Sequence, residues 1–259
     1  MNVDQLLALH DQQQRIEFES RTTRREATPE IIRHVALKHG EGIVLYSHLN
    51  AANANRVIAE QIAYYQQLGQ DFEWKTYDHD TPSDLKDRLS AQGFEAEESE
   101  ALLVLDIDTA PAILLQPITR DVRRITDLDR LEEVRRIQES VWDDPHAWLI
   151  PALSDDLVND PDHLSVYVAY AEGVPVSAAW ISFHDHSEFA GLWGGSTVAE
   201  YRGRGFYTAL LAARLQEARQ RGVRFLTIDA SPMSRPIVEK HGFQFLTITQ
   251  PFKWHVQEA

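Results

Sequence analysis

Two arginines and two glycines alternate in the segment Arg202-Gly203-Arg204-Gly205. Because glycine has no Cβ, the backbone N–H groups of such a segment can approach a bound group closely, and the arginines add positive charge. A helical pattern begins at Phe206, and the start of a helix offers unpaired N–H groups and the positive end of its dipole. This combination predicts a binding site for a pyrophosphate group.

Two common nucleotide-binding motifs do not match this segment. A P-loop needs a Gly-Lys-Ser/Thr sequence to reach a third phosphate and a magnesium ion, and the chain has none here. A dinucleotide-binding fold expects a third small residue where this chain has Tyr207. The loop therefore predicts pyrophosphate binding of another kind.

The elements that must position this loop follow from residue patterns in the C-terminal half. A long strand over 188–198 precedes the loop, and Gly194-Gly195 predicts a bulge within it. Apolar spacing predicts a helix over 206–221, which ends at Gly222. The other expected elements are helices at 128–142 and 234–240, a hairpin of 164–171 with 174–183, and strands at 223–229, 243–248 and 252–256.

The N-terminal half repeats the order strand, helix, strand, helix, strand. We expect helices at 3–18, 56–68 and 82–91, with Thr81 as the N-cap of the last, and strands at 31–36, 43–49, 72–77 and 101–107. The repeated order favours duplication and predicts two domains, 1–110 and 111–259, joined through 109–119.

The segment from Arg202 to Tyr207 resembles the signature of the GCN5-related N-acetyltransferase (GNAT) family, which is Arg or Gln, two residues, Gly, one residue, then Gly or Ala. The resemblance extends through Leu210-Leu211, the strand 225–229 and Glu239-Lys240-His241-Gly242-Phe243, and it covers about residues 120–257. It implies an α+β fold of two GNAT-like halves, each a mixed, mostly antiparallel sheet flanked by helices. The first half is expected to be degenerate, because residues 50–55 read Asn-Ala-Ala-Asn-Ala-Asn where the glycine loop would stand.

The resemblance also implies acetyl-CoA as the acyl donor and an amine, on a small molecule or a polypeptide, as the acceptor. Strand N–H groups near Val198 are expected to stabilise negative charge during the transfer. The residues expected to bind the cofactor are Ser196, Thr197, Val198, Arg202, Gly203, Arg204, Gly205, Phe206, Tyr207, Thr208 and Ser231.

The chain departs from the family pattern at three positions. Val238 stands where the family often has a Tyr that protonates the departing thiolate, and Ser231 stands where it often has an Asn. Tyr207 replaces a small residue, so its ring must turn away from the phosphates. We therefore expect either that Ser234, Ser231, Tyr207 or a water serves as the acid, with Ser234 as our choice, or that the thiolate leaves unassisted.

The general base expected from the resemblance is Glu188, at the start of the long strand, although an exposed carboxylate at a hairpin end remains the alternative. Asp229, at the end of the strand 223–229, either faces the cofactor or caps the following turn.

Two further groups of residues were weighed as binding sites. The aspartates and tryptophans of Trp142-Asp-Asp-Pro-His-Ala-Trp148 would suit a cationic amine, and core tryptophans with capping aspartates are the alternative. His184, Asp185 and His186 are expected to be solvated loop residues, and we expect no metal site.

Composition excludes several classes of function. The chain has 259 residues, no cysteine, and 40 acidic against 25 basic residues, for a formal charge of −15. It therefore lacks thiolate chemistry, and nucleic acid or an anionic membrane would repel it. The six arginines of 200–224 form a basic island, which suggests either a local anionic ligand or a solvated helix face.

With no leader and no long apolar run expected, the prediction is a cytoplasmic N-acetyltransferase. The alternative is a CoA-binding regulatory or scaffold protein that has lost catalysis.

Overall fold

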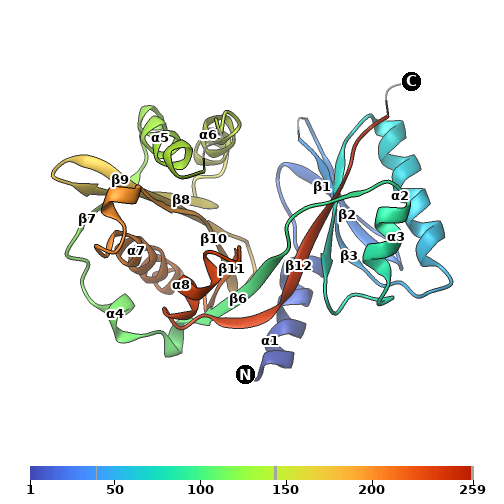
Figure 1. Cartoon of the computed structure of the whole chain (residues 1–259), viewed down its shortest axis with the longest axis horizontal. Helices are drawn as coiled ribbons and strands as arrows, with labels where there is room; N and C mark the ends of the chain where they lie inside the picture. Colours follow the sequence, from blue (N-terminus) through green and yellow to red (C-terminus); the bar gives the residue numbers. More distant parts are fainter. Residues whose placement is uncertain (39, 143–144, 258–259) are drawn as a thin grey trace. The chain divides into compact units, whose positions relative to one another are not determined.

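The computed structural model describes residues 1–38, 40–142 and 145–257, which form two compact units. Unit 1 comprises Met1–Leu103, Asp229–Glu239 and Phe245–Ala259, and unit 2 comprises Val104–Ile228 and Lys240–Gln244. These units differ from the predicted halves 1–110 and 111–259, because two C-terminal segments belong to unit 1. The colours of Figure 1 show this directly, since the red end of the chain lies among blue elements.

Unit 1 is a mixed sheet with helices. Its elements are α1 (Val3–His10), a π-helix (Asp11–Ile16), β1 (Thr23–Ala27), β2 (Ile31–Ala36), β3 (Gly42–Ser47), α2 (Ala54–Leu68), β4 (Phe72–Tyr77), α3 (Leu85–Ala91), β5 (Glu95–Ala96), β6 (Glu100–Asp106), α8 (Arg235–Glu239) and β12 (Gln244–Trp254). The strands run in the order β1-β2-β3-β4-β12, and only β3 and β4 pair in parallel. β6 passes from unit 1 into unit 2.

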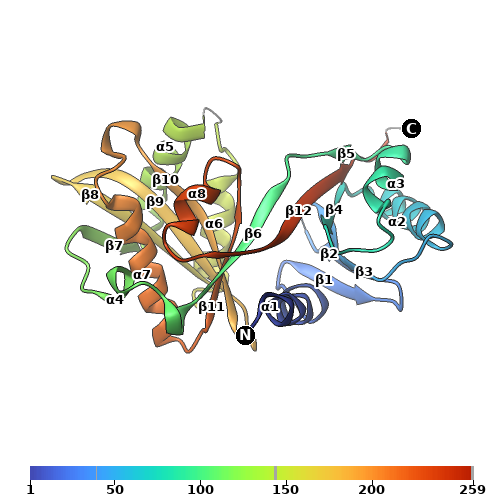
Figure 2. The same ribbon diagram turned by 60° about the horizontal axis from the view of Figure 1, so that its bottom comes forward.

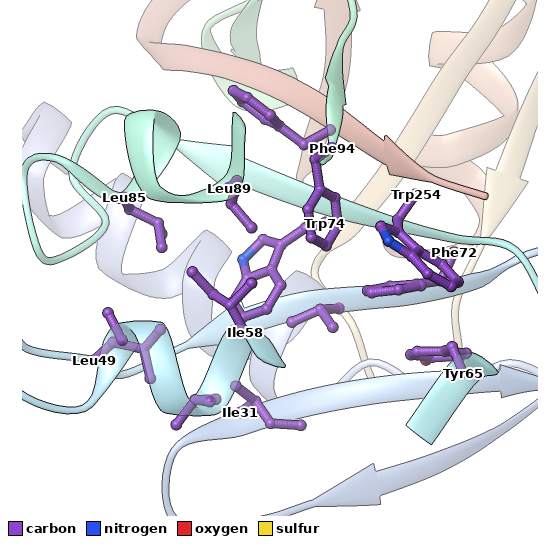
Figure 3. Close-up of a cluster of buried hydrophobic side chains, with 14 of the residues drawn as sticks. Ile31, Leu49, Ile58, Tyr65, Phe72, Trp74, Leu85, Leu89, Phe94 and Trp254 are labelled. Carbon is purple, nitrogen blue, oxygen red and sulfur yellow. The ribbon is translucent and has the colours of Figure 1, made fainter. Parts of the chain in front are cut away.

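The core of unit 1 is built largely from aromatic side chains (Figure 3). Trp74 lies near its centre, and Phe72 stacks on Tyr65 with ring centroids 4.2 Å apart. Phe252 and Trp254, both from β12, complete this core. Unit 1 therefore acquires part of its core from the C-terminal end of the chain.

β12 is one continuous strand that lies beside β4 (Figure 2). Six residues of each strand pair, from Thr249 with Tyr77 to Trp254 with Phe72. The prediction of two strands separated at Gln250-Pro251 was therefore wrong. Proline is tolerated inside this strand although it cannot donate a ladder hydrogen bond, and the carbonyl of Pro251 accepts from the amide of Glu97.

Unit 2 carries the predicted loop between a strand and a helix. Its elements are a 3₁₀ turn (Ile107–Thr109), α4 (Ala112–Leu115), β7 (Asp121–Ile125), a 3₁₀ turn (Leu128–Arg130), α5 (Leu131–Trp142), α6 (Leu149–Asn159), β8 (Leu164–Ala171), β9 (Val174–Phe183), β10 (Phe189–Thr197), a 3₁₀ turn (Ala199–Tyr201), α7 (Phe206–Gln220) and β11 (Phe225–Ala230, whose last two residues belong to unit 1). The strand order is β11-β10-β9-β8-β7. α5 and α6 cover one face of the sheet and α7 covers the other (Figure 1).

The two units repeat one strand–helix–strand motif. β3 and β4 pair in parallel through three residues each, as do β10 and β11, and each pair is connected by a 15-residue helix. Two antiparallel pairs precede the parallel one in unit 1 and three precede it in unit 2, and in both units a register shift interrupts the last antiparallel pairing. The repeat that the sequence indicates is thus also present in the order of the strands.

Most predicted elements are found within a few residues of their expected bounds. The N-cap prediction at Thr81 is wrong, because the helix begins at Leu85 after Asp84, and the Thr81 hydroxyl donates instead to the carbonyl oxygen of Leu49 (2.7 Å). Within the described ranges, no helix has both the length and the apolar character needed to cross a membrane.

Candidate functional site

The loop at 202–205 has the backbone geometry that its glycines predict. Gly203 and Gly205 have φ angles of +71° and +83°, in the left-handed region that favours glycine. A Cβ at either position would meet no atom within 4 Å, so the glycines are required by backbone conformation and not by lack of space. Gly205 is the N-cap of α7, and it makes no side-chain capping bond.

The first amides of α7 are therefore available to an anion. The first hydrogen bond of the helix runs from the amide of Ala209 to the carbonyl of Gly205, and the three preceding residues, Phe206, Tyr207 and Thr208, lie ahead of it. α7 is long enough for its dipole to place partial positive charge at this end.

Three arginines surround this helix start. Arg202 and Arg204 are exposed, and Arg202 Nε donates to the carbonyl of Thr197 (3.1 Å). Arg120, which the sequence analysis missed, donates through Nη2 to the carbonyl of Arg204 (2.8 Å) and lies over the Phe206 ring. This hydrogen bond turns the Arg204 carbonyl toward Arg120. No local pattern in the sequence links Arg120 to a loop more than 80 residues away.

Tyr207 is accommodated as the sequence analysis requires. Its ring lies against the backbone of Gly195, where a Cβ would be 2.9 Å from the ring, and it makes an edge contact with His241. His241 Nε2 lies 3.0 Å from the hydroxyl oxygen of Thr208. The side chains of Tyr207 and Thr208 are thus held within unit 2, and only their backbone amides point to a role with phosphate.

The predicted bulge is confirmed at Gly194-Gly195. The pairing of β9 with β10 shifts between Trp193 and Ser196, which leaves both glycines without a register partner in β9. Gly194 has a φ of +60°, and a Cβ there would lie 1.9 Å from the Trp180 ring. Gly194 is therefore needed for both conformation and space.

A polar network holds the bulge from the side of α5. Gln138 donates to the carbonyl of Gly194 (2.5 Å) and accepts from the buried hydroxyl of Ser196 (2.8 Å). The Trp142 indole donates to the same hydroxyl (3.0 Å). This network occupies the Ser196 side chain, and the Ser196 carbonyl accepts from the Ser177 hydroxyl (2.7 Å), so the predicted role of Ser196 with the cofactor stays a prediction.

A buried guanidinium lies beneath the bulge. Arg214 is 1% exposed and donates to the carbonyls of Trp180 (3.2 Å) and Trp193 (3.5 Å), on the two strands that flank the bulge. Burial lowers the pKa of Arg214 to about 10, so it remains protonated at neutral pH. The sequence analysis considered a solvated helix face for the arginines of 200–224, and that alternative is wrong for Arg214.

β10 and β11 pair in parallel only ahead of the bulge. Pairing covers Phe189–Gly191 of β10 only, although β10 continues to Thr197. The strand hydrogen bonds of the unpaired part are therefore open on the β11 side. The amide of Val198 itself donates to the carbonyl of Val176 (3.0 Å), and the expected role of the strand N–H groups near it stays a prediction.

The two predicted catalytic residues belong to different units, Glu188 to unit 2 and Ser234 to unit 1. Glu188 precedes β10, where its carbonyl accepts from the amides of Arg224 (3.0 Å) and Phe225 (2.9 Å). It is half-buried and about 20 Å along the strand from Gly194. Ser234 belongs to unit 1, where its hydroxyl donates to the carbonyl of Ser231 (3.2 Å). Their catalytic roles stay predictions.

Ser231 and Val238 also belong to unit 1. The Ser231 hydroxyl oxygen accepts from the amide of Ser234 (3.3 Å) just ahead of α8. Val238 is fully buried. An apolar side chain in that position has no proton to donate.

The carboxylate of Asp229 is engaged in an ion pair, and the two roles considered for it stay predictions. Its carboxylate pairs with Lys75 (2.5 Å) and accepts from the Thr249 hydroxyl (3.3 Å), all within unit 1. Burial alone would lower the pKa of Lys75, but Asp229 and Tyr77 raise it above its ordinary value. Asp229 is a structural ion-pair partner.

The tryptophans at 142 and 148 are not core residues. Trp142 is 47% exposed and Trp148 is 60% exposed, so the core alternative is wrong for both. Asp143 and Asp144 lie outside the described residues, and the predicted acidic contribution stays untested. Trp193, missed by the sequence analysis, is 47% exposed and begins the bulge.

The prediction of three solvated loop residues at 184–186 is wrong for His184. Its ring lies 5.1 Å from the ring of His163, and burial lowers its pKa to about 4. Among the residues that the structure describes, no group of three His, Cys, Asp or Glu side chains is arranged to hold a metal ion.

The loop at 50–55 of unit 1 differs from the loop at 202–205 of unit 2, because side chains of the loop accept hydrogen bonds from its own backbone amides. Asn50 Oδ1 accepts from the amides of Ala52 (2.9 Å) and Asn53 (3.1 Å), and Asn53 Oδ1 accepts from the amide of Asn50 (2.7 Å). Side chains of the loop itself therefore bond the amides just ahead of α2, although its N-cap Asn53 makes no side-chain capping bond to the helix. Such an arrangement does not favour phosphate binding.

Comparison with known proteins identifies a family for one part of the chain and similar solved structures for nearly all of it. Residues 128–243 match the family model described as acetyltransferase (GNAT) family. No curated protein matches the sequence.

Solved structures match over nearly the whole chain. A GCN5-related N-acetyltransferase from Kribbella flavida has a TM-score of 0.70 at 12% identity, with 95% of this chain and 94% of that chain covered. A tandem GNAT protein from the clavulanic acid biosynthesis pathway has a TM-score of 0.59 at 14% identity, with 100% and 89% covered. At such identities these two likenesses concern the fold alone. Residues 128–243 therefore match the GNAT acetyltransferase family, and the fold of the chain is similar to that of GNAT proteins.

Proposed function

We propose that the protein transfers an acetyl group from acetyl-CoA to an amine on a small molecule or a polypeptide. The observation that carries this proposal is the loop of unit 2, where two left-handed glycines open a 15-residue helix between exposed arginines. Acetyl-CoA supplies the activated acyl group. Everything else in the reaction falls to positioning and electrostatics by the chain's own residues.

The amides of 206–208 and the guanidinium groups of Arg202 and Arg204 bind the pyrophosphate in this proposal. The open edge of β10 beyond Gly191 receives the pantetheine arm. The bulge amides at Gly194-Gly195 are the candidates to stabilise developing negative charge, because Val198 is already bonded. Arg214 supports them with a positive charge beneath the bulge.

The acceptor side is the α5/α6 face of unit 2. Trp142 and Trp193 are half exposed beside the bulge, and such rings suit a cationic amine that approaches the site. Glu188 and Ser234 stay sequence predictions for the base and the acid, because Glu188 lies about 20 Å along β10 from Gly194, beyond the reach of a base that acts at the bulge.

One observation favours a second candidate, a CoA-binding protein without catalysis. Val238 is buried at the position of the family's frequent acid, and the Ser234 hydroxyl is bonded to a neighbouring carbonyl. Release of free thiol from acetyl-CoA across a panel of amines separates the two. Tight CoA binding without thiol release would favour the second candidate.

Native mass spectrometry with acetyl-CoA tests the site. We expect one cofactor per chain, and its loss in an Arg204→Glu/Gly205→Glu variant. Arg219→Glu/Gly222→Glu is the matched control, because it makes the same charge change at the other end of α7 and also replaces a left-handed glycine with open space around it. If two acetyl-CoA molecules bind per chain, the inference that the loop of unit 1 does not bind the cofactor is wrong. If no acetyl-CoA binds, the proposed transferase activity is wrong.

A further inference from the structure

A cavity of about 370 Å³ lies in unit 2 between β7 and the outer side of α7. It is lined from the β7 side by Ile118, Arg120, Val122 and Arg124, from β8 by Tyr167, and from α7 by Ala213, Gln216, Glu217 and Gln220. Its volume is in the range of small-molecule sites. No step of the proposed acyl transfer uses it.

Alternation along β7 places two cations on one face. Arg120, Val122 and Arg124 point toward α7, because side chains two residues apart share a face of a strand. Arg123, between them, points the other way, where it pairs with Asp121 and lies over the Tyr170 ring. The cavity thus has a guanidinium group on each side of an apolar residue.

These two guanidinium groups have little compensating negative charge. The described contacts of Arg120 are the Arg204 carbonyl and the Phe206 ring, which carry no formal charge. Arg124 has one carboxylate within reach, Glu217, at 3.7 Å. The cavity lining therefore contains two cations and a single anion.

That anion is already committed to other partners. Glu217 accepts from Ser165 (2.8 Å) and Tyr167 (2.7 Å), and it pairs with Arg221 at 2.7 Å. Burial alone would raise the pKa of Glu217, but these hydroxyl groups and the arginines lower it, so the group stays ionised. Since Arg221 neutralises Glu217 from outside the lining, the cavity has a net positive charge in a protein of charge −15.

We propose that this cavity binds a small ligand with two anionic groups joined by an apolar spacer, such as an aliphatic dicarboxylate. One anionic group binds the unused donors of Arg120, and the other binds Arg124. The spacer lies over Val122 and Ile118, and the amides of Gln216 and Gln220 border it. This site borders the pyrophosphate loop, because Arg120 also donates to the Arg204 carbonyl, but the proposal does not depend on the proposed transferase activity.

Isothermal titration calorimetry of the full chain at low salt tests the proposal, with succinate, adipate and suberate as probes. Butyrate, with a single carboxylate, is the control ligand. We expect at least one dicarboxylate to bind saturably, at one per chain and at least tenfold more tightly than butyrate. Arg124→Gln should weaken that binding about tenfold or more, because it removes a charge-assisted contact.

Arg123→Gln is the matched control, since it removes the same charge from the next residue on the opposite face of β7. It should leave dicarboxylate affinity within about twofold. Equal losses of dicarboxylate affinity in the two variants would mean that only the net charge of the protein matters, and they would overturn the proposal. So would the absence of dicarboxylate binding, or its abolition by saturating acetyl-CoA, which would assign the anions to the cofactor site.

Discussion

Two constraints act on Gly194, one on its backbone conformation and one on the space beside its Cα. Its φ is +60°, and the Trp180 ring occupies the place of a Cβ. Gly173, in the β8–β9 turn, has a φ of +82° but open space around it. Substituting Gly173 and Gly194 in turn therefore separates the free-energy cost of backbone strain from the cost of steric overlap.

We expect Gly173→Ala to lower the free energy of unfolding by about 1–2 kcal/mol through strain alone. Gly194→Ala should lower it by about 1–3 kcal/mol more, because the Trp180 ring must move. Urea denaturation of the two variants measures the difference. Equal losses would mean that Trp180 yields freely and does not hold the bulge.

His34 makes the stability of unit 1 depend on pH. The side chain is fully buried on β2, its Nδ1 lies 2.9 Å from the Thr23 hydroxyl oxygen, and its Nε2 has no hydrogen-bond partner among the described residues. Burial, aided by Arg25, lowers the pKa of His34 to about 4. The folded protein therefore binds this proton less readily than the unfolded chain does.

Stability should consequently fall as the pH falls from about 7 toward 4, because only the unfolded state gains the proton in that window. Between pH 7 and pH 5 the contribution of His34 is about 2 kcal/mol. We expect the free energy of unfolding of the His34→Gln variant, measured by denaturation at pH 7 and pH 5, to fall by about 2 kcal/mol less between these two pH values than that of the natural chain. Parallel pH dependences for the variant and the natural chain would contradict the assignment.

At the scale of elements, β12 links the end of the chain to the core of unit 1. Phe252 is 2% exposed within that core, whereas Phe245, on the same strand, is 36% exposed. We expect Phe252→Ala to cost about 3–5 kcal/mol of unfolding free energy, and Phe245→Ala much less. Comparable losses measured in urea would show that β12 contributes to stability by pairing alone.

Elements were predicted well where a local pattern specifies them. The 15-residue helices α2 and α7, the hairpin at Glu172-Gly173 and the bulge at Gly194-Gly195 all follow from periodicity and glycine placement. β12 was missed as one strand, because Pro251 ordinarily marks a break in a strand pattern. Its partner β4, which makes the strand continuous, lies far away in the sequence.

At the scale of the molecule, a buried ion pair joins distant parts of the sequence. Lys75 on β4 and Asp229 on β11 pair at 2.5 Å, with 15% and 11% of their side chains exposed. Removing one partner leaves the other buried without its counter-charge, so we expect Asp229→Asn to cost about 3–5 kcal/mol.

The double variant Lys75→Met/Asp229→Asn completes the test. Because no charge is then left unpaired, we expect it to recover most of that loss, in a double-mutant cycle measured by denaturation. Additive losses from the two single variants would mean that the ion pair contributes no coupling.

The sequence by itself determined the loop, its helix, the strands around it and the repeat of the two halves, because each depends on neighbours a few residues apart. Only the tertiary structure decided which side chains surround them. It brought Arg120 to the Arg204 carbonyl, buried Arg214 beneath the bulge, exposed Trp142 and committed the Val198 amide. Burial and pairing of these groups are set by strands and helices distant in the sequence, and local residue patterns carry no record of such partners.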